Sequence, residues 1–279
     1  MSGAPSQASP LLPENSGDST IEKLSSPWPS LNLRSISFIA LLLVVYSWAM
    51  SGTESEPSKL VEGFPAIVDI VSRMLPPRIE FWIVVEHFVE TLQMALIGTT
   101  GGILLSLPFA LLAARNTTPH PWVYQITRVL LNVNRAIPEL IFALMFVAAV
   151  GLGPFGGVLA IAIGSVGSLS KIFAESIEAI DPQQVMAVRA TGANPMVTFL
   201  YGVLPQALPV MTSYSIYYFE VSVRAATILG VVGAGGIGFI FQQYMALFQY
   251  DLLFGALIFM AIAITLLDRF SDYLRRRIT

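Results

Sequence analysis

The stretch Asp181–Pro209, DPQQVMAVRATGANPMVTFLYGVLPQALP, is a polar, helix-prone island between long apolar runs. Its aspartate is predicted to cap a helix that begins at Pro182, because proline in the first turn loses no hydrogen bond. Gly192 is predicted to end that helix in a left-handed conformation. The Asn-Pro pair that follows repeats the pattern and predicts a second short helix. A helix–turn–helix between two membrane spans indicates a docking element on one face of the membrane.

The composition is that of an integral membrane protein. Only 12% of the 279 residues are charged, against about 25% in a typical soluble domain, and the mean hydropathy is +0.70. A net charge of −3 gives no indication of nucleic-acid binding. The absence of cysteine excludes disulfides and thiolate metal sites, and two histidines cannot form a metal cluster alone.

The N-terminal part of the chain predicts a tail, a first span and an outer connection. Residues 1–30 are rich in Ser, Pro and Gly and are predicted to be a disordered cytoplasmic tail. Residues 31–86 hold a first transmembrane helix over Ile36–Met50, followed by an extracytoplasmic connection with an amphipathic helix near Leu60–Leu75. An alternative reads Ile36–Met50 as the apolar region of a signal peptide.

Further apolar runs predict an all-α, polytopic membrane protein with about six transmembrane helices. Thr91–Ala114 has 24 uncharged residues, enough to cross about 30 Å of hydrocarbon. Leu140–Ser170 has no charge and is too long for one crossing, so the Gly- and Pro-rich residues 151–157 are predicted to divide it. The remaining predicted spans are about 130–151, 155–171, Ser213–Gly230 and Leu252–Leu267, with residues 115–128 forming a polar connection.

The distribution of basic residues predicts the orientation. With the N-terminus inside and six spans, three of the fifteen lie outside and Arg224 lies within the membrane. The other eleven are cytoplasmic: Lys23, Arg34, Arg115, Arg128, Arg135, Lys171, Arg189, Arg269, Arg275, Arg276 and Arg277. Both termini and the docking element are therefore predicted to be cytoplasmic.

Three motifs together resemble a known family. Gly192 and Leu204-Pro205 stand at the spacing of the EAA loop of ABC importer permeases, although Met186-Ala187-Val188 occupies the Glu-Ala-Ala positions and Gly202 stands where isoleucine is usual. The upstream run RAIPEL and the downstream run AATILGVVGAGGIG strengthen the likeness. Over residues 80–279 the chain resembles the permease of phosphonate-type ABC importers, the PhnE family.

The resemblance implies a type I ABC importer permease fold in residues 87–279, with a cytoplasmic coupling loop at 172–209. It implies a homodimer in the bacterial inner membrane, an ABC ATPase dimer and an extracytoplasmic solute-binding protein. ATP and Mg would be bound by the ATPase, with no cofactor on this chain, which shows no Walker sequence. The solute would be a phosphonate, with phosphite or another phosphorus oxyanion as the alternative. The residues implied to couple to the ATPase are Arg189, Ala190, Thr191, Gly192, Ala193, Leu204 and Pro205; the alternative is a solvated connector.

Charged residues within the apolar runs are candidates for the translocation pathway. Glu220 and Arg224 stand at i and i+4 and share one helix face, either as a structural salt bridge or as a site that presents a guanidinium to an oxyanion. Glu139 begins the third span, with Arg135 one turn earlier as an i, i+4 partner. It lies either at the membrane interface or at the inner mouth of the pathway.

The glycine-rich run over 230–238 is predicted to be a hinge or gate at the outer end of a span. Its spacing is weakly similar to a nucleotide-binding loop, but no strand precedes it and Gly-Lys-Ser/Thr is absent. The hinge residues are Gly233, Gly235, Gly236 and Gly238.

Two other function classes stay open at this stage. A proton-coupled secondary transporter would use Glu220 or Glu139 and would lose uptake when the proton gradient collapses. An integral membrane enzyme would need a cluster of His, Asp or Glu at one depth, which the positions of His87 and His120 do not favour.

Overall fold

A computed structural model describes residues 33–53 and 57–278; the predicted tail over residues 1–30 lies outside them. The chain divides into two compact units, Met1–Ile67 and Val68–Thr279. All regular structure in the described residues is helical, so the all-α prediction is confirmed.

The first unit contains an apolar helix and the start of an amphipathic one. Helix α2 (Leu33–Gly52) carries one charge, Arg34, and is long enough at about 30 Å to cross a membrane. Helix α3 (Pro57–Arg73) begins in this unit and agrees with the amphipathic helix predicted near residues 60–75. Its apolar side chains Leu60, Phe64 and Ile67 are exposed.

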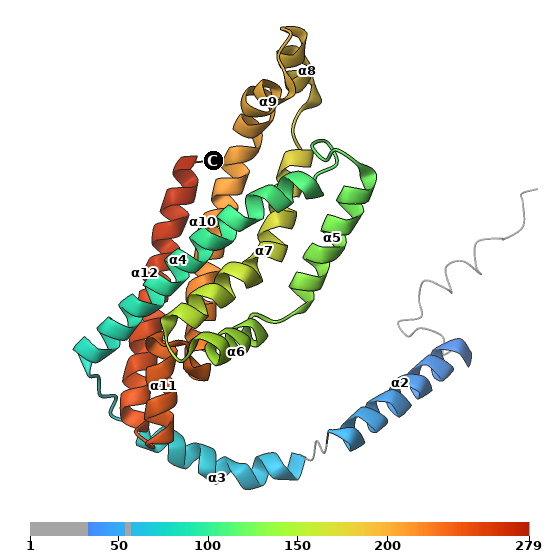
Figure 1. Ribbon diagram of the computed structural model, residues 1–279. Coiled ribbons are helices and arrows are strands. Elements are labelled where there is room, and N and C mark those ends of the chain that lie inside the picture. The colour runs from blue at the N-terminus through green and yellow to red at the C-terminus, as the bar shows by residue number, and fades with distance from the viewer. Residues whose placement is uncertain (1–32, 54–56, 279) are drawn as a thin grey trace, which may run out of the picture. The chain divides into compact units, whose positions relative to one another are not determined.

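The second unit is a helical bundle built around α7 (Figure 1). Helix α7 contacts four others and carries the buried side chains Phe173, Leu169 and Ile161. Glycines bring α4 close to α7, since a Cβ on Gly98 or Gly102 would collide with α7 side chains. The bundle helices are α4 (Phe81–Ala113), α5 (Pro121–Ala136), α6 (Glu139–Val150), α7 (Pro154–Glu178), α10 (Leu204–Leu229) and α12 (Tyr250–Ile278).

The predicted polar connection over 115–128 is wrong from Pro121 onward, because helix α5 begins there, capped by His120. The third predicted span is instead a broken pair, in which α5 and α6 meet at an angle of 82°. Pro138 cannot continue α5, and the residue before it is extended, with φ −90° and ψ 118°. The described residues contain five helices able to span a membrane, or six with this pair, in agreement with the predicted number.

The docking element consists of one separate short helix and the first turns of a longer helix that continues into the next span. Helix α8 (Pro182–Ala190) is separate, as predicted. The second short helix is not, because α9 (Pro195–Thr198) runs through a π-helical segment, η1 (Phe199–Val203), directly into α10. The π-helical segment η1, which has wider turns than an α-helix, lies just before Pro205. Proline has no N–H and would interrupt the hydrogen bonds of a regular α-helix. The fifth span is therefore the end of a continuous helix over Pro195–Ala234.

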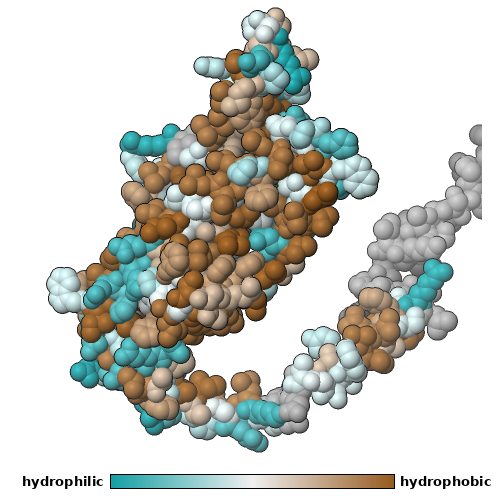
Figure 2. All heavy atoms as spheres, in the orientation of Figure 1, coloured by the Kyte–Doolittle hydropathy of each residue, from teal (hydrophilic) through white to brown (hydrophobic). Residues whose placement is uncertain are grey.

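The glycine run folds back at the far end of α10. A second π-helical segment, η2 (Gly230–Ala234), ends in a turn, and α11 (Gly236–Ala246) then packs against α4 and α10. Figure 2 shows apolar side chains over the middle of the bundle and hydrophilic residues around α8 and toward the opposite end.

Candidate functional site

The caps predicted for the docking element are present. The Asp181 carboxylate accepts a hydrogen bond from the Gln183 N–H at 2.9 Å, and Asn194 Oδ1 accepts one from the Val197 N–H at 2.9 Å. Gly192 has a φ of +80°, the left-handed conformation expected at the end of α8. The two caps and the left-handed glycine define the shape of residues 181–203, which we call the docking hairpin.

The tip of the docking hairpin is small and solvent-exposed. Arg189, Ala190, Thr191 and Gly192 are exposed, Ala193 is half-buried, and a Cβ on Gly192 would meet no atom within 4 Å. A partner surface can therefore approach the backbone of the tip closely. Leu204 and Pro205 are not brought to the tip, because they begin α10, about 14 Å along the continuous helix from Pro195.

A groove of about 720 Å³ lies between the docking hairpin and the adjoining ends of α4 and α7. Most of its lining is apolar, with Glu178 and Arg189 as the charged residues. The apolar lining includes Leu111, Ile180, Val185, Met186, Met196 and Phe199.

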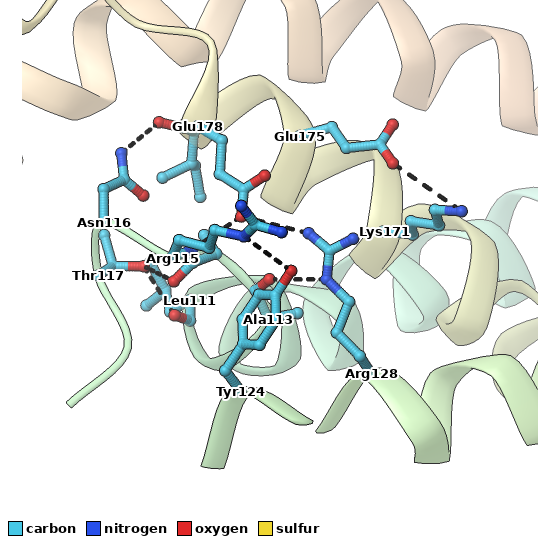
Figure 3. Close-up of polar contacts among 12 residues, drawn as sticks. Leu111, Ala113, Arg115, Asn116, Thr117, Tyr124, Arg128, Lys171, Glu175 and Glu178 are labelled. Atoms are coloured by element: carbon cyan, nitrogen blue, oxygen red, sulfur yellow. Dashed lines mark hydrogen bonds and ion pairs between the residues drawn. The ribbon is translucent and has the colours of Figure 1, made fainter. Parts of the chain in front are cut away.

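A polar brace beside this groove was missed by the sequence analysis (Figure 3). The Glu178 Oε1 atom, at the end of α7, accepts hydrogen bonds from the Arg115 N–H at 2.8 Å and from Arg128 Nη2 at 3.2 Å. Arg128 Nε also donates to the Ala113 carbonyl at 3.1 Å. One carboxylate therefore joins the ends of α4 and α7 to the middle of α5, four residues before α8 begins.

Tyr124 completes the brace from α5. Its hydroxyl accepts a hydrogen bond from Arg115 Nε at 3.1 Å, and the guanidinium carbons of Arg115 and Arg128 lie 5.5 and 4.9 Å from its ring centre. The Tyr124 hydrogen bond, with a smaller contribution from the Glu178 carboxylate, raises the pKa of Arg115 above its ordinary value. Asn116 adds a bond from Nδ2 to the Ile177 carbonyl at 2.6 Å. The only sequence signal was the pair of arginines and the tyrosine in 115–128.

The predicted Glu220–Arg224 pair forms, but its shorter contacts run to α12. The buried Glu220 carboxylate accepts a hydrogen bond from Arg275 Nη2. Arg224 Nη2 is 3.9 Å from Glu220 Oε2, whereas Arg224 Nη1 is 3.4 Å from Asp268 Oδ2. Asp268 directly follows the uncharged residues 252–267 of α12, so Arg224 lies at the level where that apolar stretch ends. The geometry is that of a brace between α10 and α12.

The expected i, i+4 pairing of Arg135 with Glu139 is wrong. The helix breaks between them, so the two residues do not share a helical face, and no ion pair joins them in the described structure. Glu139 instead begins α6 and packs against α7, where a Cβ on Gly164 would meet its Cγ at 2.9 Å. Arg135 lies 14 residues after the start of α5, which is about 21 Å along that helix. It therefore does not lie in a loop, although the distribution of basic residues had placed it among the cytoplasmic ones.

The predicted hinge glycines form the tight turn between η2 and α11. Gly233, Gly235 and Gly236 have φ values of +93°, +80° and +69°, which disfavour any residue with a Cβ. Gly238 lies inside α11, where a Cβ would collide with the Thr227 carbonyl of α10. The conformations fit a turn that needs glycine for steric reasons; the gating role remains a prediction.

A cap on this turn comes from α4 and was also missed. Glu90 Oε2 accepts a hydrogen bond from the Gly236 N–H at 3.0 Å, and Thr91 Oγ1 accepts one from the Ile237 N–H at 2.8 Å. His87 Nδ1 lies 3.1 Å from the same Glu90 oxygen. The carboxylate therefore stabilises the N-terminus of α11 across 146 residues of sequence.

The same end of the unit carries a second long-range bond, outside the spanning helices. The Tyr244 hydroxyl of α11 donates to Glu80 Oε2 at 2.8 Å. Burial and the Glu80 carboxylate raise the pKa of Tyr244 to about 12, so the hydroxyl stays protonated and keeps donating.

No group of three or more His, Asp or Glu residues able to hold a metal ion occurs within residues 33–53 and 57–278.

Comparison with known proteins gives a match over most of the chain. The family model described as "Binding-protein-dependent transport system inner membrane component" matches residues 106–279. The phosphite transport system permease protein PtxC of Stutzerimonas stutzeri is 40% identical over 252 residues, which cover 89% of this chain and 90% of that protein. The phosphate-import permease protein PhnE of Mycolicibacterium smegmatis is 41% identical over 218 residues, covering 77% of this chain and 41% of its own.

Solved structures agree on the fold. An inward-facing form of the MetNI methionine ABC transporter matches with a TM-score of 0.63 and 24% identity, covering 71% of this chain and 97% of that one. The likeness extends to the type I ABC importer permease architecture implied by the sequence motifs. The family match and the identity to a permease over most of both chains show that this chain belongs to the family of binding-protein-dependent transport system inner membrane components.

Proposed function

We propose that this permease subunit of an ABC importer carries a phosphorus oxyanion, a phosphite or a phosphonate, across the inner membrane. The observation that supports the proposal most is the 40% identity to a phosphite permease over nearly the whole of both chains. A second relative, the putative cryptic phosphonate permease protein PhnE2 of Escherichia coli, is 45% identical over 118 residues.

The energy would come from a separate ATPase that binds the docking hairpin. The tip residues 189–193 are exposed or half-buried and small, and two side-chain caps and a left-handed glycine fix the shape of the hairpin. Glu178 would pass displacement of α8 to α4 and α5, because its carboxylate joins the end of α7 to the end of α4 and the middle of α5. ATP and Mg would be bound by that partner and not by this chain.

One copy would form half of the pathway, so two copies, an ATPase dimer and an extracytoplasmic binding protein complete the importer. The positive-inside distribution supports cytoplasmic termini and a cytoplasmic docking hairpin. Within this arrangement Glu139 would border the pathway, the glycine turn at 233–238 would adjoin the outer gate, and Glu220 and Arg224 would brace α10 against α12.

The experiment is solute uptake by the permease reconstituted in liposomes with candidate ATPase and binding-protein subunits. We expect uptake of phosphite or phosphonate that requires ATP on the side of the membrane that holds the ATPase and that persists when the proton gradient is collapsed. Uptake that survives ATP depletion and stops with the proton gradient would instead establish a proton-coupled secondary transporter.

The docking site is tested by cross-linking, which the absence of native cysteine makes specific. Thr191→Cys at the tip should cross-link to single cysteines on the ATPase surface, whereas Ser37→Cys on α2 should not. A complex that forms and transports normally after deletion of the tip would refute the proposed docking role.

A further inference from the structure

Helix α5 has a polar face that the described structure leaves uncovered. Gln125, Asn132 and Arg135 are exposed and lie at spacings of seven and three residues, on one side of the helix. Arg128 lies between them on the same side and joins the brace at the cytoplasmic end. The other exposed residues of α5 are apolar: Trp122, Ile126, Val129, Leu130 and Val133. A helix in a membrane with two such faces meets lipid on one side and water or protein on the other.

Arg135 lies deep between the two ends of the bundle. It is 14 residues from the start of α5, or about 21 Å. Ser168 of α7 lies ten residues, or about 15 Å, from the end of α7 at Glu178. Tyr218 of α10 lies 14 residues, or about 21 Å, from the start of α10. Each of these three polar side chains therefore lies at least about 15 Å along its helix from the end named.

Arg135 and Glu139 pack against two glycines of α7. A Cβ on Gly167 would meet Arg135 Cγ at 2.7 Å, and one on Gly164 would meet Glu139 Cγ, so both charged residues pack directly on α7 one turn apart. Tyr218 packs against the buried cluster that contains Leu131 of α5 and Leu169 of α7, and Ser168 is the α7 residue next to Gly167. Four elements thus bring one guanidinium, two hydroxyls and one carboxylate together where α5 breaks into α6.

A charged side chain at this depth is stable only beside water, protein or a ligand. Arg135 is an exposed residue about 21 Å along α5, and no acidic residue forms an ion pair with it in the described structure. A guanidinium facing hydrocarbon is costly, and such residues line water-filled cavities or bind charged solutes. The buried Glu220, by contrast, is neutralised by Arg275 and faces α12.

We infer that Arg135, Ser168, Tyr218 and Glu139 form a transient binding site for a phosphorus oxyanion in the translocation pathway, which the polar face of α5 lines. This inference rests on the proposed function and names the residues that the solute would meet. It moves the solute contact from the Glu220–Arg224 pair to the break between α5 and α6.

The chemistry of the four groups fits this class of solute. The planar fork of Arg135 matches two oxygens of a tetrahedral oxyanion, and the hydroxyls of Ser168 and Tyr218 supply further donors. In its ionised form the Glu139 carboxylate only accepts hydrogen bonds, so that form favours an anion that still carries a P–OH hydrogen. Sulfate, which has no such hydrogen at neutral pH, would leave that carboxylate unpaired beside a negative charge.

The first test measures water access and solute protection at the site. Ser168→Cys is nearly isosteric, and Val133→Cys is its control at the depth of Arg135 on the apolar side of α5. In the assembled transporter we expect an anionic thiosulfonate reagent to modify the thiol of the Ser168→Cys variant but not that of the Val133→Cys variant. Phosphite or a phosphonate should slow the reaction at position 168, and sulfate should not. Equal reactivity at both positions, or protection by sulfate alike, would overturn the inference.

The second test measures transport. Arg135→Gln should lower phosphite uptake at least about tenfold, from the loss of a charge-assisted contact, while ATP hydrolysis by the assembled complex continues. Arg269→Gln, which removes an exposed charge from α12, should transport as the unchanged protein does. Normal uptake by Arg135→Gln would discard the site and leave the proposed function standing. Absence of phosphite and phosphonate uptake by the unchanged transporter would overturn the proposed function itself.

Discussion

Removal of the Glu178 carboxylate should loosen the junction of α4, α5 and α7. Its Oε1 atom accepts from the Arg115 backbone N–H at 2.8 Å and from Arg128 Nη2 at 3.2 Å, and the side chains of Glu178 and Arg128 are each about a quarter exposed. Glu178→Ala removes both contacts at once. Arg128 keeps its bond to the Ala113 carbonyl and its position over Tyr124, so the loss is confined to the carboxylate.

The expected cost is about 2 kcal/mol. A hydrogen bond from a backbone N–H to a charged acceptor contributes about 1.5 kcal/mol at the lower end of its range. A partly exposed ion pair adds about 0.5 kcal/mol, because solvent screens it. Glu178→Gln keeps an accepting oxygen and loses the charge, so about half the effect is expected. For a bundle of this size, 2 kcal/mol corresponds to a Tm lowered by about 4–8 °C.

The assay is thermal unfolding of the purified permease in detergent, followed by tryptophan fluorescence. Glu175→Ala is the matched control: it lies one turn earlier on α7, and its 3.9 Å contact with Lys171 is exposed on both sides. That change should stay within about 0.5 kcal/mol of the unchanged protein. If Glu178→Ala lowers Tm no more than Glu175→Ala, the brace does not hold the helix ends together.

Three further predictions concern α11 and the residues that contact it. Gly238→Ala should destabilise by about 1–3 kcal/mol, because its Cβ would collide with backbone that cannot move cheaply; Gly63→Ala, with nothing within 4 Å, should not lower Tm. Glu90→Gln should weaken the cap on α11 by about 1 kcal/mol and speed hydrogen exchange at the first amides of that helix. Glu86→Gln, which changes an exposed residue, should leave those exchange rates unchanged. Equal exchange rates in the two variants would refute the cap. Tyr244→Phe should destabilise equally from about pH 6 to pH 9, because a raised pKa gives stabilisation that is complete below the unfolded value of about 10 and lost only as pH rises through about 12. A destabilisation that varied across that range would contradict the assignment.

Local sequence rules were sufficient where a contact joins near neighbours. The caps at Asp181 and Asn194 and the left-handed Gly192 were predicted correctly, because each depends on residues within three positions. The rules failed at residues 121–128, where the polar side chains of a helix were interpreted as part of a connection. Pairing Arg135 with Glu139 failed because Pro138 breaks the helix that the pairing assumed.

The braces could not be found from the sequence. Glu178 reaches Arg115 across 63 residues, Glu90 reaches Gly236 across 146, and Glu220 reaches Arg275 across 55. Nothing in the spacing of such residues indicates a contact. Among the ion pairs around Glu220, the i, i+4 rule found only the longest one, the 3.9 Å contact between Glu220 and Arg224.

The sequence by itself determined that the chain is an all-helical membrane protein with a capped hairpin between spans, because hydropathy and capping depend on composition and near neighbours. The tertiary structure decided which charged residues meet, which face of α5 stays uncovered, and where the helices break. Those properties depend on how distant helices pack, and glycine contacts such as those of α7 with α4, α5 and α6 set distances that no local pattern encodes.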